Sequence, residues 1–376
     1  MEQPVHILQM VDSLEIGGAE NLVFELASKL ASTGYRITVC CCESGSLVGD
    51  LERLGIRVDL LSWRGKIDPL LVLQMVRIIQ RDPPQIVHTH LFKSDFHGRL
   101  AARLGGVPIV LSTLHNCDQW AKNPVSGSIY GLTTLLADRL IAVADEVRDF
   151  AIRYFHVSPS RIVTISNAIQ TERFSNQKAA GARFRSEMGI SSDTPLFGIV
   201  ARLDPQKDHK TFLQAAKLIT MVDPRARFII VGDGRLRSIL EGLAVELGID
   251  QSVSFLGMRK DIPAIMAAIN VLVLSSLYEG LPLTLLEGMA AARPVVSTAV
   301  NGVKGIVVDG ETGFLVPCAN PQALADSCLR LIADQNLCNQ MGQAGYERAR
   351  TRYGLDAMND QIVHLYQSLL IQKKMI

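Results

Sequence analysis

The sequence predicts an α/β fold with two doubly wound, Rossmann-like parallel-sheet domains in succession. Short apolar segments alternate with amphipathic segments through both halves, the pattern of strands and helices in a parallel sheet. The 376 residues are enough for two domains of ordinary size. A polar stretch at residues 171–181 is the expected linker, so we predict a first domain at 1–170 and a second at 171–354.

Composition indicates a globular protein and excludes some classes of function. The chain is 48% hydrophobic and 20% charged, and its net charge of +1 argues against a dedicated nucleic-acid binder. Its seven cysteines include no C-x-x-C pair, which fits a reducing cytosol. The N-terminus leads straight into a strand without a signal peptide, and no apolar run approaches the ~18 residues of a membrane span. We therefore expect a cytoplasmic location.

Strands are expected where apolar and β-branched residues cluster, and helices where apolar residues recur every three to four positions. The predicted strands are 5–11, 37–42, 58–61, 85–90, 109–114, 138–143, 161–166, 195–201, 227–231, 253–256, 270–274, 294–298 and part of 309–316. The predicted helices are 21–31, 69–81, 94–105, 236–247, 282–289, 321–333, 336–351 and 355–372. Since ligands bind beyond the carboxyl ends of parallel strands, His90, His115 and Asn116 are candidate site residues.

The stretch that joins the strand at 270–274 to the next helix carries the clearest chemistry. Gly280 lets the backbone approach a ligand, and Pro282 suits the first position of a helix, whose free N–H groups attract phosphate. The carboxylates of Glu279 and Glu287 would instead face neutral hydroxyls beside it. A nucleotide sugar has this arrangement. Alternatively, Glu279 only favours the helix dipole and Glu287 is a solvated surface residue.

Two cations follow the strand at 195–201. Arg202 and Lys207 lie five residues apart across a proline turn, so both side chains can converge on one anion. If a diphosphate must leave, fixed cations stabilise the negative charge that develops on it, and Arg and Lys can do so without a metal. The alternative is a surface ion pair with Asp204 or Asp208.

At these motifs the sequence resembles the retaining glycosyltransferases of family four (glycosyl transferases group 1), which have the GT-B fold. The resemblance rests on four motifs in order: GGAE at 17–20, a strand-end His115, Arg202 with Lys207, and Glu279 with Glu287. It implies two domains that face each other across a cleft, a UDP- or GDP-sugar donor, retention of anomeric configuration, and neither a cofactor nor a protein-bound metal.

The resemblance also implies roles for single residues. His115 and Glu279 would contact the donor sugar, and Glu287 would bind the ribose hydroxyls. Arg202 and Lys207 would stabilise the leaving diphosphate. The expected catalytic residues are His115, Arg202, Lys207 and Glu279, and the expected donor-binding residues are Gly17, Gly18, Gly232, Met258, Arg259, Gly280, Leu281, Pro282, Leu283 and Glu287.

The chain departs from the family pattern at several positions. Gln170 replaces an Asp at the exit from the first domain, and Arg235 replaces a Pro. Asn301 and Gly305 replace a Gly and a Glu of the family's GGvpE sequence. Functions that the family assigns to the missing carboxylates are therefore not transferred to this chain.

By the same resemblance, the acceptor is expected on the first domain, and the last helix (about 355–376) is expected to pack back on it. The acceptor would be a glycan or a lipid-linked glycan in bacterial cell-surface polysaccharide synthesis. A basic surface could touch anionic lipid at the inner face of the membrane, or be an ordinary solvated face. Its residues are Lys93, Arg99, Arg103, Trp120 and Lys122.

Other interpretations stay open. His88, His90 and His115 together could supply three zinc ligands, although family members work without a protein-bound metal. A sugar-nucleotide epimerase of the same fold would bind a similar donor and use no acceptor. An inactive sugar-nucleotide-binding partner of another transferase would keep the fold and lose turnover.

Overall fold

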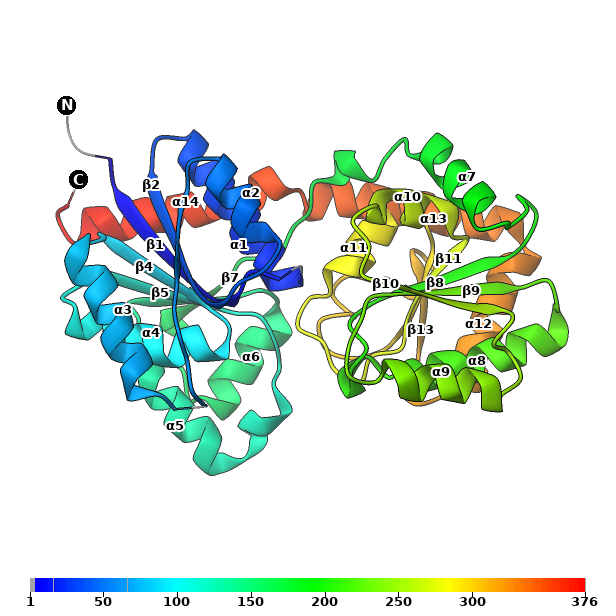
Figure 1. Ribbon diagram of the computed structural model, residues 1–376, viewed down its shortest axis with the longest axis horizontal. Helices are drawn as coiled ribbons and strands as arrows, with labels where there is room; N and C mark the ends of the chain where they lie inside the picture. Colours follow the sequence, from blue (N-terminus) through cyan, green and yellow to red (C-terminus); the bar gives the residue numbers. More distant parts are fainter. Residues whose placement is uncertain (1–3, 16, 66, 376) are drawn as a thin grey trace. The chain divides into compact units, whose positions relative to one another are not determined.

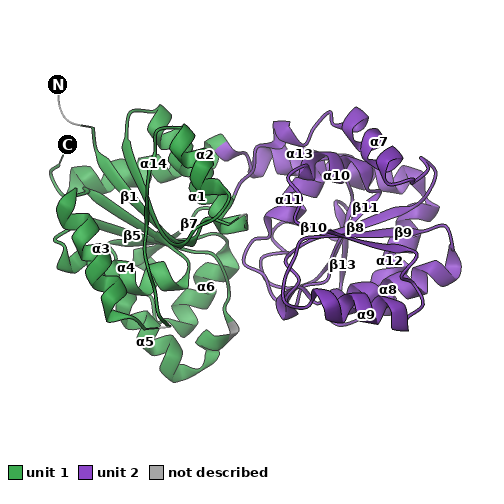
Figure 2. Cartoon of the chain, in the orientation of Figure 1, with its two compact units in different colours: residues 1–167, 356–376 green, residues 168–355 purple. Residues whose placement is uncertain are grey.

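The computed structural model describes residues 4–15, 17–65 and 67–375, and the chain divides into two compact units (Figures 1 and 2). Unit 1 comprises residues 1–167 and 356–376, and unit 2 comprises residues 168–355. Each unit contains one parallel sheet with helices on both faces, which confirms the predicted fold class.

Unit 1 is built on a seven-stranded sheet with the order β3-β2-β1-β4-β5-β6-β7. All neighbouring strands are parallel. The strands are β1 (His6–Ser13), β2 (Arg36–Glu43), β3 (Arg57–Leu60), β4 (Ile86–His90), β5 (Ile109–Leu114), β6 (Arg139–Ala142) and β7 (Ile162–Thr164). Strand order reverses between β1 and β4, which is where ligands bind in sheets of this topology.

The helices of unit 1 cover both faces of this sheet. They are α1 (Gly18–Ser32), α2 (Leu47–Arg53), α3 (Pro69–Arg81), α4 (Phe92–Leu104), α5 (Pro124–Thr134), α6 (Asp145–Tyr154) and α14 (Leu355–Gln372), with the short turns η1 (Gln119–Lys122) and η2 (Pro159–Arg161). Gly98 of α4 packs on Met10 and Thr89, while Tyr366 of α14 contacts their neighbours Gln9 and His88. Since adjacent strand residues point to opposite faces, α4 and α14 cover opposite sides of the sheet.

The last helix, α14, packs on the rest of unit 1 and buries its apolar stripe there. Ile362, Tyr366, Leu369 and Leu370 are all at most 6% exposed, and Leu365 is half-buried. The Tyr366 hydroxyl is buried against polar groups of β1 and β4, so this helix contributes directly to the environment of the strand ends.

Unit 2 contains a six-stranded parallel sheet with the order β10-β9-β8-β11-β12-β13. Its strands are β8 (Leu196–Val200), β9 (Arg227–Val231), β10 (Val253–Gly257), β11 (Val271–Leu274), β12 (Val295–Thr298) and β13 (Gly313–Val316). Its helices and turns are η3 (Thr171–Arg173), α7 (Lys178–Glu187), η4 (Pro205–Lys207), α8 (His209–Val222), α9 (Arg237–Glu246), α10 (Ile262–Ala268), α11 (Leu283–Ala290), α12 (Pro321–Ala333) and α13 (Gln335–Arg352). Strand order reverses between β8 and β11.

Some helices lie outside the predicted segments. The structure adds α2, α5, α6, α8 and α10, and α7 begins at Lys178, within the stretch predicted as a linker. Helix α1 begins at Gly18 and not at residue 21, so Gly17 and Gly18 stand at its N-terminus. Among the described residues, no helix combines the length and apolar character that a membrane span requires.

Candidate active site

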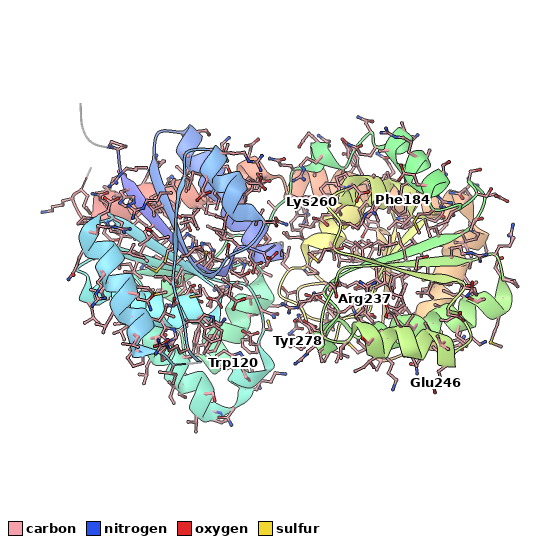
Figure 3. The ribbon with its side chains drawn as sticks, in the orientation of Figure 1. Trp120, Phe184, Arg237, Glu246, Lys260 and Tyr278 are labelled. Carbon is pink, nitrogen blue, oxygen red and sulfur yellow. The ribbon has the colours of Figure 1, made fainter. Side chains whose placement is uncertain are left out.

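In unit 2, the loops that follow β8 and β11 are hydrogen-bonded to each other at the point where strand order reverses. The carbonyl oxygen of Gln206 accepts a hydrogen bond from the Leu277 N–H at 2.8 Å. The side-chain amide of Gln206 donates to the carbonyl oxygen of Tyr278, labelled in Figure 3, at 2.9 Å. These two bonds hold the loop of predicted cations against the loop of the first predicted carboxylate.

Lys207 and Glu279, predicted from separate motifs, form an ion pair in this place. The Lys207 ammonium lies 2.6 Å from Glu279 Oε1, and the Ser276 hydroxyl donates to the same oxygen at 2.5 Å. The Lys207 side chain is 17% exposed and the Glu279 side chain 6%. Because an ammonium has three N–H donors, Lys207 can hold Glu279 and contact a further anion at the same time.

Arg202 is arranged differently. Its Nε donates to Asp204 Oδ2 at 2.5 Å, and the side chain is 70% exposed. This is the surface ion pair that the sequence left open as an alternative. The pair uses Nε only, and no hydrogen bond joins the terminal guanidinium nitrogens to another described residue. Those nitrogens remain available to a ligand.

The N-terminus of α11, four residues after Glu279, is a candidate anion site. The helix begins at Leu283 with Pro282 as its N-cap, one position later than predicted, and no side chain of the described residues caps it. The Thr284 hydroxyl in the first turn is buried, and it has no hydrogen-bond partner within the described part of the chain. Uncapped N–H groups and an unpartnered hydroxyl favour an anion in this position.

Close backbone packing against the loop before α11 explains the glycine at position 302. Gly302 has φ +77°, and a side chain there would collide with the carbonyl oxygen of Gly280. Backbone packing alone therefore requires glycine at 302. Gly232 has the same kind of explanation, since its φ is +129° and a Cβ would strike the carbonyl oxygen of Ala201.

Glu287 lies in the second turn of α11 and is partly buried. Burial raises the pKa of its carboxyl group to about 7, and the charge of Arg173 opposes that rise. Among the described residues, no hydrogen-bond donor satisfies this carboxyl group. It is not the fully solvated surface residue of the alternative interpretation, and a ligand hydroxyl would supply the missing donor.

Met258 and Arg259 follow β10, which is two strands from β8. Met258 is 54% exposed, and the Arg259 guanidinium is paired with Asp261 at 2.7 Å. No hydrogen bond in the described chain joins either residue to Lys207 or Glu279. These two predicted residues thus stand at the edge of the site.

In unit 1, His115 sits at the end of a buried hydrogen-bond chain. His115 Nε2 lies 3.1 Å from His90 Nδ1, and His90 Nε2 lies 2.8 Å from the side-chain oxygen of Gln9. The Gln9 amide donates to the Tyr366 hydroxyl at 3.2 Å. His90 must donate to Gln9, so its Nδ1 accepts and His115 Nε2 donates. This pattern leaves the lone pair of His115 on Nδ1, which has no partner among the described residues.

Burial keeps these imidazoles neutral. It lowers the pKa of His88 to about 3 and of His115 to about 4, and burial with the neighbouring imidazoles holds the pKa of His90 well below its usual value. Within the described residues, no three His, Cys, Asp or Glu side chains are placed to hold a metal ion. His90 is hydrogen-bonded to His115 and Gln9, while His88 is hydrogen-bonded to Tyr366 and Thr113.

Gly17 and Gly18 form the start of α1, after the carboxyl end of β1. Gly17 is the N-cap in an extended conformation, and no side chain of a described residue caps the helix. Since φ of Gly17 is −152°, the backbone conformation does not demand glycine there. This helix start offers backbone N–H groups to a ligand, and donor binding by Gly17 and Gly18 stays a prediction.

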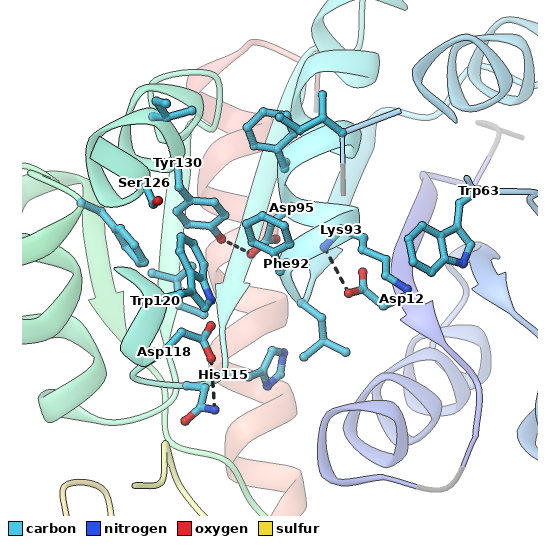
Figure 4. Close-up of a pocket in the computed structure, with 17 residues that line it drawn as sticks. Asp12, Trp63, Phe92, Lys93, Asp95, His115, Asp118, Trp120, Ser126 and Tyr130 are labelled. Carbon is cyan, nitrogen blue, oxygen red and sulfur yellow. Dashed lines mark hydrogen bonds between the residues drawn. The ribbon is translucent and has the colours of Figure 1, made fainter. Parts of the chain in front are cut away.

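Unit 1 also contains a cavity of about 670 Å³ beside His115 (Figure 4). Its walls combine aromatic side chains with three carboxylates that the sequence analysis did not select, Asp12, Asp95 and Asp118. Asp12 lies near the carboxyl end of β1, so the strand-end rule would have found it. Phe92 and Tyr130 carried no comparable signal, because α4 and α5 bring them together from distant positions.

The prediction of a basic surface is wrong for two of its five residues, Arg99 and Arg103. Arg99 is fully buried and bonds to Asp95, Ser112 and Tyr130. The Arg103 guanidinium is bound to backbone carbonyl oxygens and to the carboxylate of an aspartate. These side chains tie α4 to the sheet and to α5, so they are not available to anionic lipid.

Comparison with known proteins identifies relatives of both units. The family described as Glycosyltransferase Family 4 matches residues 16–173, and the family described as Glycosyl transferases group 1 matches residues 182–348. The UDP-Gal:alpha-D-GlcNAc-diphosphoundecaprenol alpha-1,3-galactosyltransferase of Escherichia coli is 28% identical over 375 residues, or 95% of each chain.

Two further proteins are similar to this chain. The N-acetyl-alpha-D-glucosaminyl L-malate synthase of Bacillus anthracis is 28% identical over 80% of this chain and 78% of its own. The crystal structure of Anabaena HepE in complex with UDP-glucose superimposes with a TM-score of 0.88 at 22% identity, covering 96% of this chain and 99% of that one. The second comparison establishes the shared fold.

Proposed function

The chain belongs to the glycosyl transferases of group 1, glycosyltransferase family 4, and from that premise we propose that it moves a sugar from a UDP-sugar to a glycan acceptor carried on a lipid. The observation that carries the proposal is the Lys207–Glu279 ion pair beside the uncapped N-terminus of α11. The 28% identity to the Escherichia coli galactosyltransferase over 95% of both chains supports a lipid-linked acceptor, and we propose that the transfer serves bacterial polysaccharide synthesis.

The charged groups of unit 2 suit the charged and neutral parts of a nucleotide-sugar donor. Its diphosphate would lie at the start of α11, with Lys207 and the terminal nitrogens of Arg202 on its oxygens. Glu279, already adjacent to Lys207, would accept hydrogen bonds from the transferred sugar. Glu287 would accept hydrogen bonds from the ribose hydroxyls. These hydroxyls would supply the donors that its carboxyl group lacks among the described residues.

In the proposed reaction, the bond between C1 of the sugar and the phosphate oxygen breaks, and its electron pair leaves with the diphosphate. The acceptor oxygen forms the new bond to C1 on the same face, and its proton passes to the leaving phosphate. Negative charge on the diphosphate grows in the transition state. Fixed cations that face this charge lower the barrier because they need no reorganisation.

The acceptor is proposed to bind in the cavity of unit 1, next to His115.

The neutral imidazole of His115, held by His90, would contact the donor sugar through a hydrogen bond. His90, Gln9 and Tyr366 would then act as positioning residues that keep the ring in one orientation and one tautomer.

A thermal-shift screen tests the donor assignment directly. UDP and UDP-sugars should raise the apparent melting temperature more than GDP or ADP do, because they bind the folded state. Incubation with a UDP-sugar alone separates the rival enzyme, since an epimerase converts the sugar without an acceptor. Binding of UDP-sugar without transfer to any glycan would favour the inactive partner subunit.

We expect turnover to be independent of added metal. The cations at the diphosphate are supplied by the chain, and the sequence has no D-x-D motif. The rate should be unchanged after treatment with EDTA. A loss of turnover that magnesium or manganese restores would contradict this prediction.

We propose contact between the chain and the inner, cytoplasmic face of a membrane through α5 of unit 1. Val125, Ile129 and Leu132 follow the helical spacing of four and three residues and are 67%, 49% and 67% exposed. The helix carries no charged residue. An exposed apolar helix face of this kind can insert into the lipid interface. The seven free cysteines agree with a reducing compartment.

Flotation with liposomes tests this contact. The wild-type chain should float with vesicles, and Val125→Asp with Leu132→Asp should lose most of that binding. Ile239→Asp, on an equally exposed apolar residue of unit 2, is the control and should float like wild type. If the wild-type chain stays in the soluble fraction, the membrane contact is refuted and a soluble acceptor is favoured.

A further inference from the structure

The cavity of unit 1 has a charge pattern that selects among acceptors. We propose that it receives an uncharged sugar ring at the reacting end of the acceptor and excludes rings that carry phosphate or carboxylate. This inference rests on the proposed transfer to a glycan and adds its specificity. It follows from three features of the cavity wall: paired cations, a capped helix terminus and a carboxylate that lacks a cation.

Among the described residues, the cations at the cavity are already paired. The ammonium of Lys93 lies 2.8 Å from Glu43 Oε1 and 3.4 Å from the centre of the Trp63 ring. Arg99, beneath the wall, is fully buried and lies 3.3 Å from Asp95 Oδ2. An anionic acceptor would have to compete with these carboxylates for its counter-ion.

The N-terminus of α4, which could otherwise bind a phosphate, is already capped by a carboxylate. Helix α4 starts at the cavity with Phe92, and its first N–H groups point toward the end of β1. Asp12 accepts hydrogen bonds from the N–H groups of Lys93 at 3.1 Å and Ser94 at 2.7 Å. The carboxylate of Asp12 therefore occupies the position of an incoming anion and neutralises the positive end of the helix.

Asp118 adds a negative charge that no cation of a described residue offsets. Among the described residues, no Lys, Arg or His lies within ion-pair distance of its carboxyl group, and Asn116 Nδ2 is 3.4 Å from Oδ1. Burial raises the pKa of Asp118 to about 6, so it is mostly ionised at pH 7.5. A carboxylate in this position accepts hydrogen bonds from sugar hydroxyls and repels a phosphate.

The aromatic walls suit the apolar faces of a sugar ring. Trp120 is 38% exposed and meets the Phe92 ring edge-on, with ring centres 4.9 Å apart. Phe92 in turn stacks on Tyr130 at 5.6 Å. The negative faces of aromatic rings attract the polarised C–H groups of a sugar, and they offer nothing to an anion.

Tryptophan fluorescence provides a direct readout. The chain contains two tryptophans, Trp63 and Trp120, and both line this cavity. Methyl α-glycosides of glucose, galactose and N-acetylglucosamine are titrated as neutral probes, and their 6-phosphates and L-malate as anionic probes. At least one neutral glycoside should change the fluorescence saturably, with a Kd at least about tenfold lower than its 6-phosphate, since tenfold corresponds to a repulsion of about 1.4 kcal/mol.

The variant Asp118→Asn should bring the Kd of the 6-phosphate closer to that of its neutral partner. Asp149→Asn removes the same charge from an exposed position on α6 and should leave the ratio unchanged. Equal or tighter binding of the anionic probes, or no fluorescence response to any neutral glycoside, overturns the inference. Stabilisation by UDP is measured on the same samples, so loss of the donor site would be recognised separately.

Discussion

Replacing Lys207 by alanine is expected to lower kcat by about 10²-fold or more, while the KM for the donor changes less. The ammonium faces the diphosphate, where negative charge grows between the bound donor and the transition state. An interaction that strengthens in the transition state appears in kcat, and loss of one such donor costs on the order of 10²–10³-fold in other enzymes. Steady-state kinetics with varied donor concentration measures both constants.

The structure requires two controls for this experiment. Removal of Lys207 leaves the carboxyl group of Glu279 buried without its cation, which could disturb the loop by itself. The double variant Lys207→Ala with Glu279→Gln removes that unpaired charge. If the double variant recovers kcat, the loss came from the stranded carboxylate. Lys210→Ala, an exposed lysine three residues away, should behave like wild type.

A change in KM alone after Lys207→Ala would contradict the proposed role. It would mean that the ammonium holds the diphosphate equally before and during bond cleavage. In that case Arg202, whose terminal guanidinium nitrogens are free in the described chain, would become the better candidate for the residue that stabilises the transition state.

The predicted residues that the structure brings together are those that follow the ends of neighbouring parallel strands. Arg202, Lys207 and Glu279 each follow a buried strand, and the order of strands in a parallel sheet brings β8 and β11 together. The ends of adjacent parallel strands lie at one edge of the sheet, so residues that are 72 positions apart form an ion pair. The sequence could therefore predict that Lys207 and Glu279 lie close together, but it could not predict their ion pair.

The prediction failed where side chains from several helices meet. Asp95 and Arg99 have the spacing of an exposed helix pair, and the sequence suggested a solvated basic face. Three partners from other elements, Ser112, Tyr130 and Thr133, complete the bonds of the guanidinium and bury it. Nothing in the local sequence of α4 indicates that those partners arrive.

Helix α5 escaped prediction for a related reason. Its sequence contains Gly127 and Gly131, which disfavour a helix in isolation. In the fold, side chains at these positions would collide with the carbonyl oxygens of Ala121 and Phe155. The glycines allow close packing of helix against backbone, so tertiary contact compensates for weak helix propensity.

Replacing Glu287 by glutamine is expected to raise the donor KM by about tenfold and to change kcat less. A carboxylate accepts stronger hydrogen bonds from ribose hydroxyls than an amide does, and the difference of about 1.4 kcal/mol corresponds to one power of ten. The ribose does not change during transfer, so this binding is the same in ground and transition states and appears in KM. Glu246→Gln, an exposed glutamate on α9, is the matched control.

The pH dependence of the donor KM gives an independent test of the same residue. Burial raises the pKa of Glu287 to about 7, so the free enzyme is mostly protonated at pH 6 and mostly ionised at pH 8. The donor binds the ionised form, and KM should therefore fall as pH rises from 6 to 8. Glu287→Gln cannot ionise, so it should lose this dependence and keep a high KM at both values. A variant that loses kcat while retaining the wild-type KM and its pH dependence would show that Glu287 belongs to the chemical step and not to ribose binding.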